Sequence, residues 1–177
     1  ISNQMTDLSV KVGVRIRPLL SKERHQSNSL TNYDSESIEF KNQTFTYDNV
    51  FGLDLSQQEL YQNTAAPMLK SFLDGFNVTI IAYGQTGSGK TYTMGTADNE
   101  SQDPNSQGLV PRFVCDLFDN IDQYSQNEKL EANVKVSFLE IYGEDVYDLS
   151  GETANSNSAE KESLYVREND VGQVFVQ

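Results

Sequence analysis

The chain has 177 residues, of which 37% are hydrophobic and 22% are charged, and its 13 basic and 26 acidic side chains give a formal net charge of −13. This length is enough for one domain with a substantial core. The acidic excess argues against a nucleic-acid-binding surface on this segment. No apolar run approaches the roughly 18 residues that a membrane span needs, so we expect no membrane partner.

The sequence contains one cysteine, Cys115, which excludes an internal disulfide framework and is typical of a reducing compartment. Its place in an apolar helical pattern predicts a position in or near the core. Met5 lies inside the sequence, and nothing at the N-terminus is arranged like a secretory signal. We therefore expect the chain to be part of a longer protein.

The first predicted element is a strand from Ser9 to Arg17, in which valine and isoleucine alternate with polar or small residues. Arg15, Arg17 and Pro18 come at its end. In open α/β sheets, ligands collect at that end of the strands. The two guanidinium groups are therefore candidates for a binding site.

A small hairpin and a long helix are predicted next. Ile38–Phe40 and Thr44–Tyr47 are short candidate strands separated by a three-residue turn. Ser56 then begins a capping box, and apolar residues at helical spacing predict a helix from there to about Asp74. Gly75 is expected to end it.

The central feature of the sequence follows a predicted strand, Asn77–Tyr83, which is apolar and β-branched. The next eight residues match the pattern G-x-x-x-x-G-K-[ST], in which the backbone N–H groups of a glycine-rich loop surround phosphates. These candidate residues are Gly84, Gln85, Thr86, Gly87, Ser88, Gly89, Lys90 and Thr91. Lys90 would bring a positive charge to the β- and γ-phosphates, and the Thr91 hydroxyl would bind Mg²⁺. The alternative is a flexible Gly/Ser turn, but a chance match arises in about one such sequence in a few hundred, and the preceding strand favours the phosphate site.

Beyond the loop we expect alternating surface segments and apolar elements. Gly95–Gly108 is polar and predicts a surface loop, and Val110–Ile121 has the spacing of a helix. Val134–Phe138 predicts a strand, whose continuation through Leu139 and Ile141 is expected to be central and buried.

The C-terminal part is predicted to be a loop and a hairpin. Ser150–Ser163 is polar and without periodicity, and Leu164–Glu168 and Gln173–Val176 are expected to pair as a closing hairpin. No linker divides the chain, so residues 1–177 are expected to belong to one domain. Helices alternating with strands indicate an α/β fold with a mixed central sheet flanked by helices.

Four segments of the sequence resemble kinesin motor domains and occur in the order that this family has. They are Val10–Leu19, Phe45–Phe51, Ala82–Gly95 and Phe138–Tyr142. The resemblance covers essentially the whole chain, which corresponds to about the N-terminal half of a kinesin motor. Gly108–Arg112 is, together with the run from Arg17 to Leu20, most similar to the kinesin-4 branch.

The resemblance implies a P-loop NTPase fold that binds ATP and Mg²⁺, in a microtubule motor of the cytoplasm and cytoskeleton. The family's adenine site corresponds to Arg15, Arg17, Pro18 and Tyr92. Guanidinium planes and an aromatic ring can stack on a purine. Without the resemblance, Tyr92 would be interpreted as ordinary helix surface.

The family's two switch motifs are absent from these 177 residues, so the resemblance implies no catalytic residue here. Asp148 begins a string that imitates one of them, but it follows a turn rather than an apolar strand. We expect it to be a loop carboxylate. The acidic charge is then explained if the basic face that contacts microtubules lies outside the chain.

Two alternatives to a microtubule motor remain open at this point. One is a kinesin-like scaffold that binds a filament or a signalling partner without ATP turnover. The other is a different P-loop NTPase, which would be distinguished by whether Arg15, Pro18 and Tyr92 produce a preference for adenine.

Overall fold

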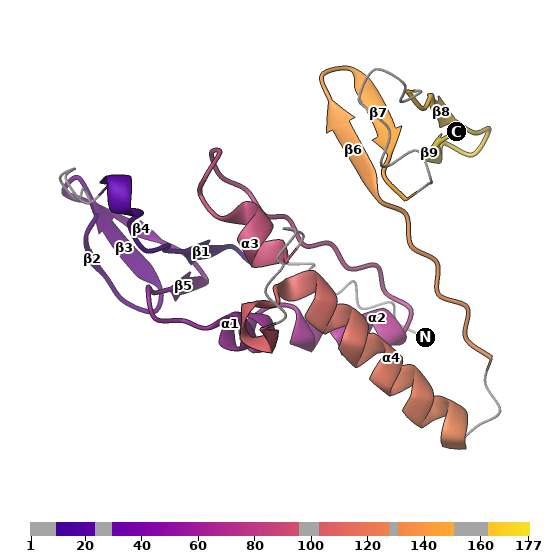
Figure 1. Cartoon of the computed structure of the whole chain (residues 1–177), viewed down its shortest axis with the longest axis horizontal. Coiled ribbons are helices and arrows are strands. Elements are labelled where there is room, and N and C mark those ends of the chain that lie inside the picture. Colours follow the sequence, from indigo (N-terminus) through magenta and orange to yellow (C-terminus); the bar gives the residue numbers. More distant parts are fainter. Residues whose placement is uncertain (1–9, 24–29, 96–102, 128–130, 151–162) are drawn as a thin grey trace, which may run out of the picture. The chain divides into compact units, whose positions relative to one another are not determined.

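The computed structural model describes residues 10–23, 30–95, 103–127, 131–150 and 163–177, and Figure 1 shows the whole chain. The chain divides into two compact units, Ile1–Glu128 and Lys129–Gln177, and each is considered by itself. The strands and short 3-10 helices of the first unit are β1 (Gly13–Arg15), η1 (Ser21–Glu23), β2 (Leu30–Tyr33), β3 (Ser37–Phe40), β4 (Gln43–Thr46), β5 (Asn49–Phe51) and η2 (Pro104–Ser106). Its α-helices are α1 (Gln57–Asn63), α2 (Ala66–Leu73), α3 (Lys90–Met94) and α4 (Leu109–Asn127). The second unit contains β6 (Leu139–Tyr142), β7 (Asp145–Asp148), β8 (Val166–Glu168) and β9 (Val174–Val176).

The first predicted strand forms only in its central part. β1 pairs in parallel with β5, and the Ile16 N–H extends the pairing by donating to the Phe51 carbonyl oxygen at 2.9 Å. Val10, at the N-terminal side, is 85% exposed, and Ser9 lies outside the described residues. The strand is therefore shorter than the alternation of its side chains predicts, because β5 is its one ladder partner in the part of the chain that the structure describes.

The small hairpin is confirmed as β3 and β4, which pair antiparallel. Its two turn residues, Lys41 and Asn42, both have positive φ values, 50° and 62°. Two consecutive left-handed residues are the geometry that matches the twist of a two-residue hairpin. β2, which the sequence did not predict, adds a third antiparallel strand beside β3.

The long predicted helix is two helices. The capping box at Ser56 is present, with the Ser56 hydroxyl accepting from the Glu59 N–H and the Glu59 carboxylate accepting from the Ser56 N–H. The helix breaks after Asn63, because Pro67 has no N–H to continue the ladder and its ring clashes with the carbonyl four residues earlier. Gly75, with φ 92°, ends α2 as predicted.

Helices α1, α2 and α4 pack against one another and carry the core of the first unit (Figure 1). The buried cluster contains Phe51, Leu60, Tyr61, Ala65 and Leu109. Ile80 and Met94, which lie on either side of the glycine-rich loop, pack against this cluster. The core therefore anchors both ends of the loop.

The predicted helix over Val110–Ile121 is confirmed within α4, but the expected burial of Cys115 is wrong. Leu109 and Leu117 are 5% and 7% exposed, and Phe113 lies between them on the same face. Cys115 is two residues from Phe113, a rotation of about 200° around the helix, and so lies on the exposed side.

The strands predicted at Asn77–Tyr83 and Val134–Phe138 do not form. Asn77–Tyr83 has no ladder partner among the described residues, and Val134–Phe138 stays outside β6 although its last carbonyl oxygen accepts from the Leu149 N–H at 2.7 Å. The described strands make four separate small sheets instead of one central sheet. Ile81 and Tyr83 are 80% and 98% exposed. A β-branched sequence favours an extended backbone, but a strand requires a neighbour to accept its hydrogen bonds.

The second unit consists of two hairpins. β6 pairs with β7 across a turn at Gly143, and β8 pairs with β9, which confirms the closing hairpin. Val146 is buried and bridges to Leu164. The expected burial of Leu139 and Ile141 is wrong, since they are 42% and 76% exposed. A two-stranded ribbon has no second layer to cover its apolar face.

In the parts of the chain that the structure describes, no helix combines the length and apolarity needed to cross a membrane. Most of the two predicted polar loops lies outside the described residues: residues 96–102 of the first loop and residues 151–162 of the second. The remainder of the first loop contains η2.

Candidate nucleotide-binding site

The glycine-rich loop forms a tight turn at the start of α3. The Ser88 N–H donates to the Gln85 carbonyl oxygen at 3.1 Å, and Gly89 caps the helix with φ 103°, in the left-handed region. A Cβ on Gly84 would lie 2.5 Å from the Ser88 hydroxyl oxygen. Glycine at these two positions is therefore required by the turn itself.

Lys90, the first residue of α3, folds back over this loop. Its ammonium group donates to the carbonyl oxygens of Gly84 at 2.7 Å and Gln85 at 3.0 Å. The positive charge is thereby held beside the loop backbone. The Thr91 side chain, one residue later, is exposed. A phosphate held by the loop would therefore meet a lysine charge and a neighbouring hydroxyl, which is the donor set expected for phosphate with a divalent cation.

Two of the four residues predicted to contact a base lie against each other. The Arg15 guanidinium carbon is 5.1 Å from the centroid of the Tyr92 ring, although 77 positions separate the residues in the sequence. Arg15 also donates to the Thr93 hydroxyl oxygen at 2.9 Å. Burial lowers the pKa of the Arg15 guanidinium from its usual range, and Tyr92 is 47% exposed. The pair thus joins a partly desolvated cation to an aromatic ring that is accessible to a ligand.

Gln57, which is not among the residues predicted for the site, forms hydrogen bonds to both members of this pair. Its side-chain oxygen accepts from Arg15 at 2.8 Å, and its amide nitrogen donates to the Tyr92 carbonyl oxygen at 2.7 Å. The signal was present in the sequence: Gln57 precedes Leu60 and Tyr61 by three and four residues, so a polar side chain occupies the buried face of α1.

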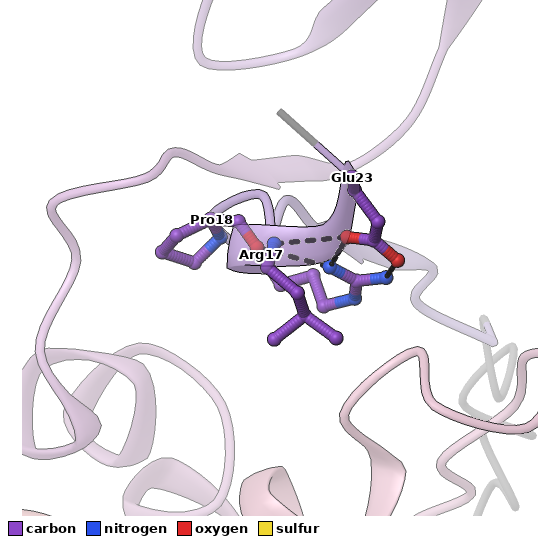
Figure 2. A network of polar contacts seen from close by, with 4 residues as sticks. Arg17, Pro18 and Glu23 are labelled. Carbon is purple, nitrogen blue, oxygen red and sulfur yellow. Dashed lines mark hydrogen bonds and ion pairs between the residues drawn. The ribbon is translucent and has the colours of Figure 1, made fainter. Parts of the chain in front are cut away.

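Arg17 and Pro18, the other two predicted base contacts, belong to a separate network (Figure 2). The Arg17 guanidinium makes a two-pronged ion pair with Glu23, at 2.7 and 2.8 Å, and also donates to the Pro18 carbonyl oxygen at 3.0 Å. The Leu20 N–H donates to the same carboxylate at 2.9 Å. The ion pair lowers the pKa of Glu23 to about 2. Because these bonds lie in the plane of the guanidinium, its flat faces remain suited to stacking.

Asp148, the carboxylate in the misleading switch-like string, ends β7 and stabilises a turn. It accepts from the Ser150 N–H at 2.8 Å and from the Ser150 hydroxyl. These hydrogen bonds lower the pKa of Asp148. Asp148 is thus the last residue of a strand, opposite Leu139, and the expected loop begins one residue later. Within the described ranges, no three His, Cys, Asp or Glu side chains are grouped so as to hold a metal ion.

Comparison with known proteins identifies the family. The kinesin motor domain profile matches residues 8–177. The kinesin-like protein KIF21B of Mus musculus is 36% identical over 180 residues, and klp-19 of Caenorhabditis elegans is 42% identical over 148 residues. These alignments cover 96% and 81% of this chain but only 11% and 14% of the relatives.

Solved structures of kinesins are also similar to this chain. A fast kinesin superposes with a TM-score of 0.75 at 30% identity, covering 96% of this chain and 46% of the other. The Drosophila kinesin NOD, crystallised with manganese and ADP, superposes with a TM-score of 0.72 at 29% identity, covering 89% and 56%. The chain thus spans about half of the motor structures it matches, and its fold is that of the P-loop NTPases. The predicted resemblance is confirmed, and the chain belongs to the kinesin motor domain family.

Proposed function

We propose that this chain is the ATP-binding part of a kinesin-like motor, and that the whole protein couples ATP hydrolysis to movement along microtubules. The observation that carries the proposal is the contact between Arg15 and Tyr92. Tyr92 directly follows the glycine-rich loop in the sequence, and Lys90 folds back over that loop. One end of this arrangement suits phosphates and the other suits a flat base. An adenine nucleotide has both parts.

The phosphates are assigned to Gly84–Thr91, with Lys90 as the fixed cation and Thr91 as the protein ligand of Mg²⁺. The backbone of this loop supports the assignment, because a Cβ on Gly87 or Gly89 would extend into open space that an anion can occupy. Bound ATP would supply the γ-phosphoryl group. Lys90 would have to exchange its carbonyl partners for phosphate oxygens, a stronger charge-assisted bond.

The base is assigned to Arg15, Arg17, Pro18 and Tyr92. Arg15 and Tyr92 already contact each other, and Glu23 orients Arg17. Stacking on these groups does not require the γ-phosphate. The site should therefore accept ADP as well as ATP.

Three structures of one relative, NOD, support the choice of ligands and partner. NOD was crystallised with divalent manganese and ADP, and also with AMPPNP, and another study describes nucleotide-free NOD complexed to the microtubule. We propose that this chain takes an adenine nucleotide with Mg²⁺, that the whole protein binds microtubules, and that it resides in the cytoplasm on the cytoskeleton. We also propose that residues 1–177 are the N-terminal part of one motor domain, since the family profile runs through both units.

The test is steady-state ATP turnover by the purified whole protein, with and without stabilised microtubules. We expect turnover to rise on adding microtubules, and Lys90→Ala to remove both the basal and the stimulated rate. ATP binding without turnover would favour the scaffold alternative. The same assay with GTP distinguishes a base-selective motor from a general nucleotide hydrolase.

A further inference from the structure

Gln57 is the one polar residue that is buried among those the structure describes, with 2% of its surface exposed. It is the first residue of α1, held in place by the capping box at Ser56. Its amide contacts three segments distant in sequence: Arg15 at the end of β1, Tyr92 in α3 and, at 3.3 Å, the Ser106 carbonyl oxygen in η2. A buried amide that links three elements fixes their relative positions, because water cannot replace its bonds.

The two ends of this amide act on the two halves of the base-binding pair. The oxygen accepts from the Arg15 guanidinium at 2.8 Å, while the nitrogen donates to the Tyr92 backbone at 2.7 Å. An amide has one acceptor and one donor group in a rigid plane. Gln57 therefore links the Arg15 guanidinium to the Tyr92 backbone through one side chain, and the Thr93 hydroxyl, at 2.9 Å, is a second acceptor for the same guanidinium.

We propose that Gln57 is a positioning residue for base recognition, which sets the Arg15–Tyr92 pair for stacking on the purine. This inference rests on the nucleotide site proposed above. Gln57 acts through Arg15 and Tyr92, and among the described residues its side-chain hydrogen bonds go to Arg15, Tyr92 and Ser106 and not to the phosphate loop. Its removal should weaken binding of the base and leave binding of the phosphates unchanged.

The experiment replaces Gln57 by Met in the whole protein, which keeps the length of the side chain and removes both hydrogen-bonding groups. Gln58→Met is the matched control, since Gln58 is the next residue of α1, is exposed, and contacts Arg112 outside the site. Two probes are used: a fluorescent ADP analogue, and tripolyphosphate with Mg²⁺ as its competitor. For Gln57→Met we expect about tenfold weaker binding of the ADP analogue and less than about twofold change for tripolyphosphate. The control should bind both probes like the wild type.

Each other result has a distinct meaning. Equal weakening of both probes would show that Gln57 supports the loop generally and would overturn the inference, as would unchanged binding of the ADP analogue. A wild-type protein that binds neither probe would overturn the proposed function itself. If Gln57→Met does not fold, Gln57→Glu retains the acceptor for Arg15 and lacks the amide donor. Gln57→Glu should then weaken binding of the ADP analogue and leave binding of tripolyphosphate unchanged.

A double-mutant cycle tests whether Gln57 acts through Arg15. In an Arg15→Ala background, Gln57→Met should cost less than about twofold further affinity for the ADP analogue, because the group it positions is already absent. A full additional tenfold loss would mean independent action and would contradict the role assigned here.

Discussion

The Lys90 ammonium donates a hydrogen bond of 2.7 Å to the carbonyl oxygen of Gly84, the first residue of the loop that it closes. This bond and a second one, to the Gln85 carbonyl oxygen at 3.0 Å, hold the Lys90 charge beside the loop backbone. Phosphate oxygens would compete with neutral carbonyls for the same donor, and the charged acceptors bind more strongly. Lys90 is thus held close to the position in which it would be used.

Replacing Lys90 by Ala should reduce affinity for ATP by at least about 100-fold, because a charge-assisted bond is lost. Titration of the whole protein with a fluorescent ATP analogue measures this. Lys70→Ala, at an exposed lysine of α2, is the control and should bind normally. An unchanged titration for Lys90→Ala would refute the assignment of the loop.

Replacing Tyr92 by Ala should weaken the binding of ATP and of ADP by the same factor, about tenfold, because stacking on the base does not depend on the γ-phosphate. Equilibrium binding of the two nucleotides gives the two ratios. Tyr124→Ala, an exposed tyrosine of α4, should change neither. If only ATP binding fell, Tyr92 would have to act near the γ-phosphate instead.

The Glu23 carboxyl should titrate at about pH 2, well below its usual value of 4.5, because Arg17 stabilises the ionised form. Since the folded pKa is the lower one, the ion pair contributes stability above about pH 4.5. That contribution is lost as the pH falls from 4.5 toward 2. Carbon-13 NMR of the Glu23 carboxyl measures the titration, and Arg17→Met should return it toward 4.5. A normal titration in the wild type would argue against the pair in Figure 2.

Replacing Gly108 by Ala should destabilise the first unit by about 1–3 kcal/mol. The added Cβ would lie 2.3 Å from the backbone nitrogen of Gly95, and backbone cannot move aside as a side chain can. Urea unfolding of the whole protein gives the free energy. Gly52→Ala is the comparison, because its Cβ would meet a side chain, the Tyr33 ring at 2.8 Å, which is 37% exposed and has room to turn. If Gly108→Ala lowered the free energy of unfolding no more than Gly52→Ala does, the prediction would be wrong.

The features predicted correctly from the sequence are those made by neighbours along the chain. The capping box at Ser56 joins residues three apart, and the hairpin of β3 and β4 is closed by a short turn, which has two residues where the sequence predicted three. The glycine-rich loop is recognisable for the same reason, because the backbone angles at Gly89 are a local property. Family membership also followed from short motifs in order.

Tertiary structure decided whatever depends on partners distant in the chain. The segment Asn77–Tyr83 has the composition of a strand, yet a strand exists only where another supplies hydrogen bonds, and among the described residues none does. The side of α4 that carries Cys115 was decided by which face meets α1 and α2. Gln57 can bond to Arg15 and Tyr92 only when the fold brings three segments that are distant in sequence together. A sequence pattern records the spacing of residues along one element, whereas burial and pairing are set by the element that packs against it.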